Sequence, residues 1–195
     1  MIKLIIVNIA NAITRLRNKR SGTMICEIDV LYDQLADQDG LVREKARTRL
    51  IALGESAAPG LIKLLGDKRA QVRWEAANAL CTTIYPAAAP ALVKCLEDKV
   101  FEVRWLSTIA LINIGIDGLI PALRAILLTK KPNWLWDGVR HIVTDLSKDD
   151  DLTDILLPLR EAFLAIDYRL KVPLEARKAL YALETLPRKA RSEPV

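Results

Sequence analysis

The chain has a single histidine, His141, among its 195 residues, and this scarcity limits the chemistry that it can carry. A serine or cysteine nucleophile needs a base, and no nucleophile is marked beside His141. One histidine also excludes a histidine-rich metal cage, and no glycine-rich phosphate loop is present. The sequence therefore predicts a protein that is not an enzyme, with no catalytic residue, no metal ligand and no cofactor.

Cysteines are few as well, and they are odd in number: Cys26, Cys81 and Cys95. Widely scattered cysteines suit a reducing compartment better than a disulfide framework. We therefore expect free thiols and a cytoplasmic protein.

The sequence has no apolar run long enough to span a membrane. Residues 1–13 are apolar, but Asn8 and Asn11 interrupt them and the run falls short of the roughly 20 residues that a spanning helix needs. We expect residues 1–22 to form an amphipathic helix that caps the fold. A weak contact of residues 1–20 with a membrane surface, through the basic residues that follow the apolar run, is the alternative.

Basic charge is concentrated at the two ends of the chain. Of the net charge of +5, residues 1–21 contribute +5 and residues 188–195 contribute +2, so the rest carries −2. The body therefore offers no strong field for nucleic acid. Residues 188–195 are predicted to be a disordered basic tail.

What the sequence does contain is a repeat. The segments 42–50, 72–80 and 103–111 resemble one another and start 30 and 31 residues apart, and weaker copies follow at 139–146 and 172–180. Each places valine, a small residue and leucine on one stripe of a helix. A second helix opened by proline follows each strong copy, at Pro59, Pro90 and Pro121. Glycines lie in the turns, at Gly54, Gly115 and Gly118.

Such helix pairs bury their apolar stripes by stacking, which predicts an all-α solenoid over residues 23–187. The pattern Asp-x(5)-Arg followed by Ala and Leu, with Pro-x-Leu in the second helix, resembles HEAT repeats, in particular the short bacterial class similar to phycobilisome lyases. The resemblance implies a right-handed solenoid of about five repeats. It also implies that aspartates cap the first helices and that arginines tie adjacent repeats to them: Asp37, Asp67 and Asp98, and Arg43, Arg73 and Arg104.

Two tryptophans occupy the same place in consecutive repeats. Trp74 and Trp105 each lie two residues after the stripe valine, about 200° round the helix from it. We expect them side by side on an outer surface, with Glu44, His141 and Leu174 at equivalent places. The alternative is that each packs across onto the neighbouring first helix.

The fourth repeat departs from the pattern by an insertion between residues 128 and 139. Its Lys130, Lys131, Trp134 and Trp136 could contact a partner, whereas the alternative is that both tryptophans fill the gap left by an irregular turn. The second helices carry cations that predict a basic ladder along them: Lys63, Lys94, Arg124 and Arg160. This ladder could bind an acidic peptide, and the alternative is that it is an ordinary solvated helix face.

These patterns favour a non-catalytic scaffold or adaptor that binds another protein or peptide. Two alternatives stay open. One is nucleic-acid binding or a glycosylase-like HEAT protein, since Trp134, Trp136, Asp137 and Arg140 offer the aromatic, acidic and basic side chains that such a site uses. The other is an accessory role related to the phycobilin lyases.

Overall fold

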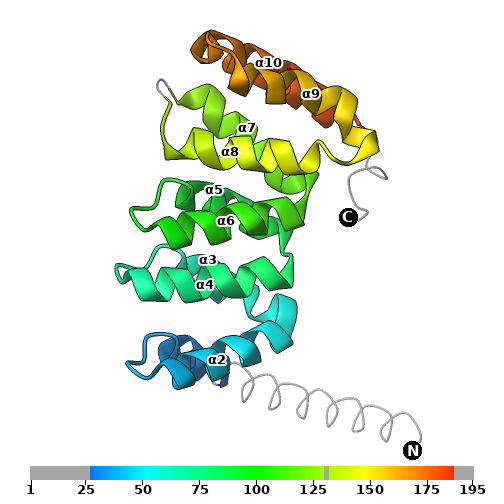
Figure 1. Cartoon of the computed structure of the whole chain (residues 1–195). Helices are drawn as coiled ribbons and strands as arrows, with labels where there is room; N and C mark the ends of the chain where they lie inside the picture. Colours follow the sequence, from blue (N-terminus) through cyan, green and yellow to red (C-terminus); the bar gives the residue numbers. More distant parts are fainter. Residues whose placement is uncertain (1–26, 130–131, 187–195) are drawn as a thin grey trace, which may run out of the picture.

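The structure, a computed structural model, describes residues 27–129 and 132–186, and within these ranges every regular element is helical. Figure 1 shows the helices stacked in layers along one axis, which is the predicted solenoid. Residues 27–34 are helical, and the later elements are α2 (Gly40–Leu53), η1 (Gly54–Ser56), α3 (Ala58–Leu64), α4 (Ala70–Thr83), η2 (Pro86–Ala88), α5 (Ala89–Cys95), α6 (Phe101–Ile114), α7 (Ile116–Leu128), α8 (Trp134–Leu146), α9 (Asp150–Leu164) and α10 (Tyr168–Thr185). The segments predicted as a capping helix and a tail lie outside the described residues.

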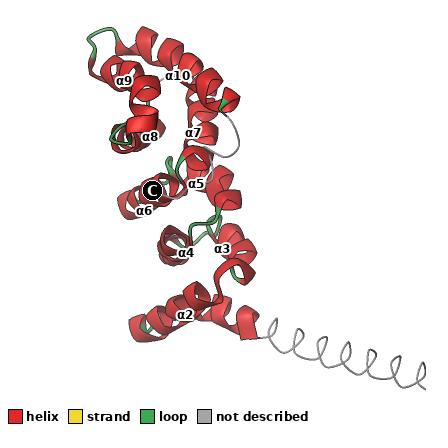
Figure 2. Cartoon of the chain, turned by 90° about the vertical axis from the view of Figure 1, so that its right-hand side faces the viewer, coloured by secondary structure: helices red, strands yellow, loops and turns green. Residues whose placement is uncertain are grey.

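The first helices of the repeats, α2, α4, α6 and α8, form one layer, which we call the first-helix layer. The second helices α3, α5 and α7 lie beside it in a second layer (Figures 1 and 2). Each first helix packs on the next, and each second helix packs on the first helix of the following repeat, α3 on α4, α5 on α6 and α7 on α8. Side chains at equivalent positions of α2, α4, α6 and α8 therefore lie in rows along one face.

The predicted apolar stripes are buried. In α4, Val72, Ala76 and Leu80 are at most 1% exposed, and Val103 and Leu111 of α6 are fully buried. Each large apolar side chain contributes about 1.5–3 kcal/mol when it leaves water. The stripes of successive repeats join in one core, because no single helix pair could cover its own.

Two of the predicted turn glycines adopt a backbone conformation that favours glycine. Gly54 and Gly115 follow α2 and α6 with φ of 56° and 74°. Gly118 instead lies inside α7, where a Cβ would be 2.4 Å from the Leu111 carbonyl oxygen, so it permits a close approach of α7 to α6. Because α7 begins at Ile116, Pro121 also lies inside that helix, and the prediction that it opens the helix is wrong.

The last two helices exchange layers. Helix α9 packs on α8, and α10 packs on α7 and α9. In Figure 2, α9 continues the first-helix layer and α10 the second layer. The weak copy at 172–180 is therefore not a first helix, and the expectation that Leu174 continues the row of Trp74 is wrong. Its stripe residues Val172 and Ala176 are buried all the same, because either layer offers an apolar surface.

Candidate functional site

Arginines at equivalent positions join each first helix to the turn before it. The Nη1 groups of Arg43, Arg73 and Arg104 each donate to two backbone carbonyls of that turn, at 2.8 and 3.0 Å, 2.9 and 3.2 Å, and 2.7 and 3.2 Å. The bonds hold the turn against the helix, because a guanidinium can donate to several acceptors at once.

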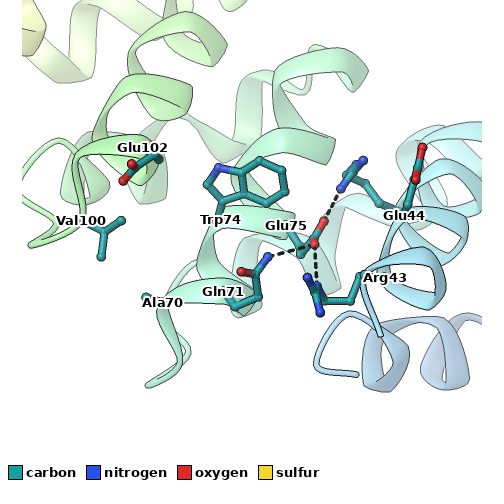
Figure 3. Close-up of a pocket in the computed structure, with 10 residues that line it drawn as sticks. Arg43, Glu44, Ala70, Gln71, Trp74, Glu75, Val100 and Glu102 are labelled. Carbon is teal, nitrogen blue, oxygen red and sulfur yellow. Dashed lines mark hydrogen bonds and ion pairs between the residues drawn. The ribbon is translucent and has the colours of Figure 1, made fainter. Parts of the chain in front are cut away.

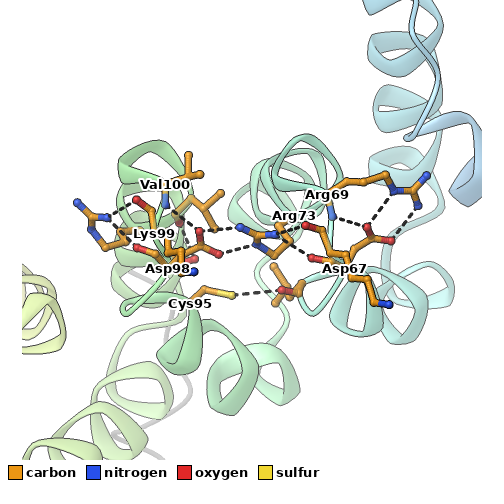
Figure 4. Close-up of polar contacts among 12 residues, drawn as sticks. Asp67, Arg69, Arg73, Cys95, Asp98, Lys99 and Val100 are labelled. Atoms are coloured by element: carbon orange, nitrogen blue, oxygen red, sulfur yellow. Dashed lines mark hydrogen bonds and ion pairs between the residues drawn. The ribbon is translucent and has the colours of Figure 1, made fainter.

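The ties between repeats differ from one arginine to the next. Arg73 donates from Nε and Nη2 to the Asp98 carboxylate, at 2.6 and 2.9 Å (Figure 4). Arg43 meets Glu75 of α4, with its Nε 3.1 Å from a carboxylate oxygen. Asp67, which has the same place in the turn before α4 that Asp98 has before α6, instead pairs with Arg69 at 2.9 Å. The implied arginine–aspartate tie between repeats is therefore present at Arg73 and replaced by glutamate at Arg43.

Arg104 continues this row, but among the described residues its guanidinium makes no hydrogen bond or ion pair with a carboxylate and interacts only electrostatically with Asp98. Its guanidinium lies 4.2 Å from the ring centroid of Trp134 and 5.6 Å from that of Phe101. An aromatic face attracts a cation, so two rings take the place that an acid takes in the earlier repeats.

The three aspartates fix turns, and this corrects the prediction that they cap helices. Each accepts the backbone amide two residues further on, at 2.8–2.9 Å, in the pairs Asp37 with Asp39, Asp67 with Arg69, and Asp98 with Val100. These bonds precede the first helical residue, and the N-cap of α2 is Asp39. The side-chain hydrogen bond from Arg69 is the main cause that lowers the pKa of Asp67 to about 2.

Glu75, which no sequence pattern indicated as important, lies in the first-helix layer and is 2% exposed. Its carboxylate accepts from Arg43, Arg47 and Gln71, and these bonds compensate the loss of water around the charge (Figure 3). A cleft of about 440 Å³ opens beside this network, next to Trp74. Nothing in the sequence distinguished Glu75, because a charged residue, Lys45, stands at the equivalent place in α2 and is exposed.

Trp74 and Trp105 take the alternative arrangement, in which each packs toward a neighbouring first helix. Arg47 of α2 lies over Trp74, 5.5 Å from the ring centroid. Trp105 meets His141 of α8 edge to face, with ring centroids 5.8 Å apart. Trp74 is half-buried, whereas Trp105 keeps 44% of its surface exposed. The two rings lie on the same layer but do not contact each other.

The exposed aromatic side chains gather between α6 and α8. Phe101 stacks on Trp105 with centroids 6.4 Å apart, and the Arg104 guanidinium lies over the rings of both Phe101 and Trp134. With His141 these rings surround a hollow of about 150 Å³, which we call the aromatic groove. Phe101 and Trp134 are 61% and 49% exposed. Large aromatics exposed together are typical of protein-binding surfaces.

Trp136 lies in the interior, and its place in the predicted partner-binding set is wrong. It is 4% exposed and meets Phe163 and Tyr168 edge to face, with centroids 6.2 and 6.3 Å away. The gap-filling alternative therefore describes Trp136, whereas Trp134 points outward. The indole Nε1 of Trp136 has no hydrogen-bond partner among the described residues.

A further cleft of about 410 Å³ brings together the side chains on which the nucleic-acid alternative depends. Trp134, Trp136, Asp137 and Arg140 all line it. Lys130 and Lys131, which precede these residues, lie outside the described part of the chain.

The basic ladder on the second helices is shorter than predicted. Lys63 and Lys94 are exposed on α3 and α5. Arg124 of α7 pairs with Glu184 of α10 at 2.6 Å, because α10 returns over α7. Arg160 lies on α9 in the other layer, 3.3 Å from the Ser147 hydroxyl, so its place in the ladder is wrong.

The thiol of Cys95 and the imidazole of His141 lie in different surroundings. Cys95 is buried against the Leu65 carbonyl, and burial raises the pKa of its thiol to about 11. His141 is exposed at the aromatic groove. Within the described residues, no group of three or more histidine, cysteine, aspartate or glutamate side chains is placed to hold a metal ion. Nor does any described helix have the length and apolar character needed to cross a bilayer.

Stacked helix pairs with a recurring arginine define the class of the protein as an α-solenoid. Residues 58–137, from α3 to the start of α8, match the family model of HEAT repeats. The crystal structure of an engineered protein is similar over 81% of this chain and 79% of that chain, with a TM-score of 0.40 and 20% sequence identity. No curated protein matches the chain.

Proposed function

We propose that the protein is a non-catalytic scaffold that binds another protein through the aromatic groove of the first-helix layer. The observation that carries the proposal is the exposure of Phe101, Trp105 and Trp134 around one hollow. Buried aromatic anchors contribute a large share of the affinity in protein interfaces. The exposure of three such rings to water is unfavourable in free energy, and a partner that buries them relieves it.

Rigidity supports the same proposal. The groove is built on α6 and α8, two helices of one core, and its floor includes Leu96 and Gly138. A Cβ at Gly138 would lie 3.0 Å from a methyl carbon of Leu96, so the floor is already closely packed. A rigid surface loses little conformational entropy on binding.

Site-specific photo-crosslinking tests the proposal. A benzophenone amino acid at position 105 is expected to capture one recurring protein in extracts of the native cell, and the same amino acid at position 63, on the second layer, is expected not to capture it. Capture of that protein with equal yield at both positions would contradict a binding site in the groove.

Nucleic-acid binding is the second candidate, because the cleft beside Trp134 also holds Trp136, Asp137 and Arg140. Phosphate contacts make such binding strongly salt-dependent. A titration with duplex and single-stranded DNA at low salt tests it. Binding that Arg140→Gln abolishes would support this candidate, and no binding at low salt would remove it.

A further inference from the structure

The row of arginines on the first-helix layer changes its partner at the third repeat. Arg43 binds the carboxylate of Glu75, and Arg73 binds that of Asp98 with two hydrogen bonds. At Arg104 the same guanidinium, with the same bonds to the preceding turn, makes no hydrogen bond or ion pair with a carboxylate among the described residues. It interacts electrostatically with Asp98, whose carboxylate Arg73 already binds.

The sequence of the following turn explains the difference between Arg73 and Arg104. The turn before α6 contains Asp98, whereas residues 129–133, before α8, read Thr-Lys-Lys-Pro-Asn and contain no acid. Trp134, the first residue of α8, lies over Arg104 instead. The position is therefore built like two that hold an acid, but the chain does not supply one here.

Arg104 is accessible from the aromatic groove, because it lines that hollow together with Trp105 and Trp134. A volume of about 150 Å³ is close to that of one side chain, so a partner enters with few residues. Charge-assisted hydrogen bonds are about twice as strong as neutral ones, and aromatic walls that exclude water strengthen them further.

We propose that Arg104 binds an aspartate or glutamate carboxylate of the partner protein, in the way that Arg73 binds Asp98. A large apolar side chain next to that acid fills the aromatic groove. The proposed partner segment is thus an acidic residue beside an apolar one. This inference rests on the proposed function, since it names what the groove recognises.

Four acidic side chains near Arg104 bear on the proposal. Glu97 is hydrogen-bonded to Asn133, and Asp98 is bound by Arg73 while it also interacts electrostatically with Arg104. Asp137 lines the groove and Glu102 lies next to Phe101, and neither pairs with a cation among the described residues. Both exposed acids repel an incoming carboxylate, so removing the charge of Asp137 is expected to strengthen binding while the loss of Arg104 weakens it.

Selection from a library of short random peptides displayed on phage, with the full chain as bait, tests the inference. The selected peptides are expected to carry Asp or Glu next to a large apolar residue. Their affinity, measured by fluorescence polarisation, is expected to fall about tenfold or more with Arg104→Gln, the loss of one charge-assisted contact. With Asp137→Asn it is expected to rise about threefold, as for an exposed charge pair.

The variants separate this inference from the proposed function. Arg104 also holds a turn, so thermal unfolding checks that the Arg104→Gln variant is folded. If that variant is unfolded, Asp137→Asn still tests the inference, because it changes only an exposed side chain. Peptides that need Trp105 but contain no acid, or that bind more weakly to Asp137→Asn, overturn the acidic recognition and leave the groove as the binding site. Peptides that bind equally well after Trp105→Ala overturn both.

Discussion

Glu75 is the one charged side chain in the described core, and at the scale of single residues it has the clearest role. Two arginines with 18–19% of their side chains exposed donate to it, together with Gln71. Arg43 and Arg47 belong to α2 and Glu75 to α4, so the network joins two repeats. Removing the acid would leave two partly buried cations facing each other.

Glu75→Ala is accordingly expected to lower the free energy of unfolding by about 2 kcal/mol, below the 3–5 kcal/mol of a fully buried pair because water reaches both arginines. Urea denaturation measures it. Glu44→Ala, on the exposed side of α2, serves as the matched control and is expected to change stability by less than about 0.5 kcal/mol. Equal effects of the two substitutions would contradict this role of Glu75.

The aspartates of the turns give stability a dependence on acid. Burial alone would raise the pKa of Asp98, but the Arg73 hydrogen bonds, the Val100 amide and the nearby arginines outweigh it and leave the pKa below its usual value. The pKa of Asp67 is lowered to about 2. A depressed pKa in the folded state contributes stability above the unfolded pKa, and that stability is lost as the pH falls through the folded value.

The free energy of unfolding is therefore expected to fall between about pH 4 and pH 2, as Asp67 and Asp98 become protonated. In the double variant Asp67→Asn, Asp98→Asn this fall is expected to be shallower, and its stability at neutral pH lower. Urea titrations at a series of pH values measure both. An unchanged slope in the double variant would show that other carboxylates cause the acid sensitivity.

Residue positions were more predictable than residue contacts. Helical periodicity placed Trp74 and Trp105 away from the stripe, and both lie on the first-helix layer. It could not show that Arg47 and His141 cover one side of each ring, because those contacts depend on the spacing of neighbouring repeats. For the same reason the burial of Trp136 and the exposure of Trp134, two residues apart, were not separable from sequence.

Truncation of these two tryptophans is expected to separate a core residue from a binding residue. Trp136→Ala leaves a cavity against Phe163 and Tyr168 and is expected to cost about 3 kcal/mol or more. Trp134→Ala removes an exposed ring and is expected to cost less than about 1 kcal/mol, mainly the stacking on Arg104. Chemical denaturation compares them. A larger loss from Trp134→Ala would reverse the assignment.

At the scale of helices, the packing of α7 on α6 depends on the absence of a side chain at Gly118. The atom that a Cβ would meet at 2.4 Å is a backbone oxygen, which cannot move without shifting α6. Gly118→Ala is therefore expected to destabilise the protein by about 2–3 kcal/mol.

Gly66→Ala is the matched control for that substitution. Its added Cβ would lie 3.5 Å from the Lys63 carbonyl oxygen, an ordinary contact, so little change is expected. Thermal unfolding of both variants measures the difference. A tolerated alanine at position 118 would mean that α7 packs further from α6 than described.

Helices and their order were predictable, but the layer of each helix was not. The apolar stripe of α10 resembles that of a first helix, yet α10 packs on α7 in the second layer. A stripe specifies which side of a helix is buried and leaves open which surface buries it. The exchange of α9 and α10 moved Arg160 away from Lys63 and Lys94 and brought Glu184 to Arg124.

At the scale of the whole molecule, stacking turns equivalent positions into rows. The first-helix layer carries the arginine row, the buried Glu75 network and the aromatic groove, whereas the second layer presents Lys63 and Lys94. The two layers therefore offer different chemistry to a partner. The segment that matches the family of HEAT repeats, residues 58–137, includes Arg73 and Arg104 of the row and most of the groove.

The affinity of the crosslinked partner for two single variants tests this account most directly. Isothermal titration is expected to show a loss of about tenfold or more for Trp105→Ala, as for an aromatic anchor, and a change within about twofold for Lys94→Ala on the second layer. A partner that is released by Lys94→Ala and retained by Trp105→Ala would contradict it.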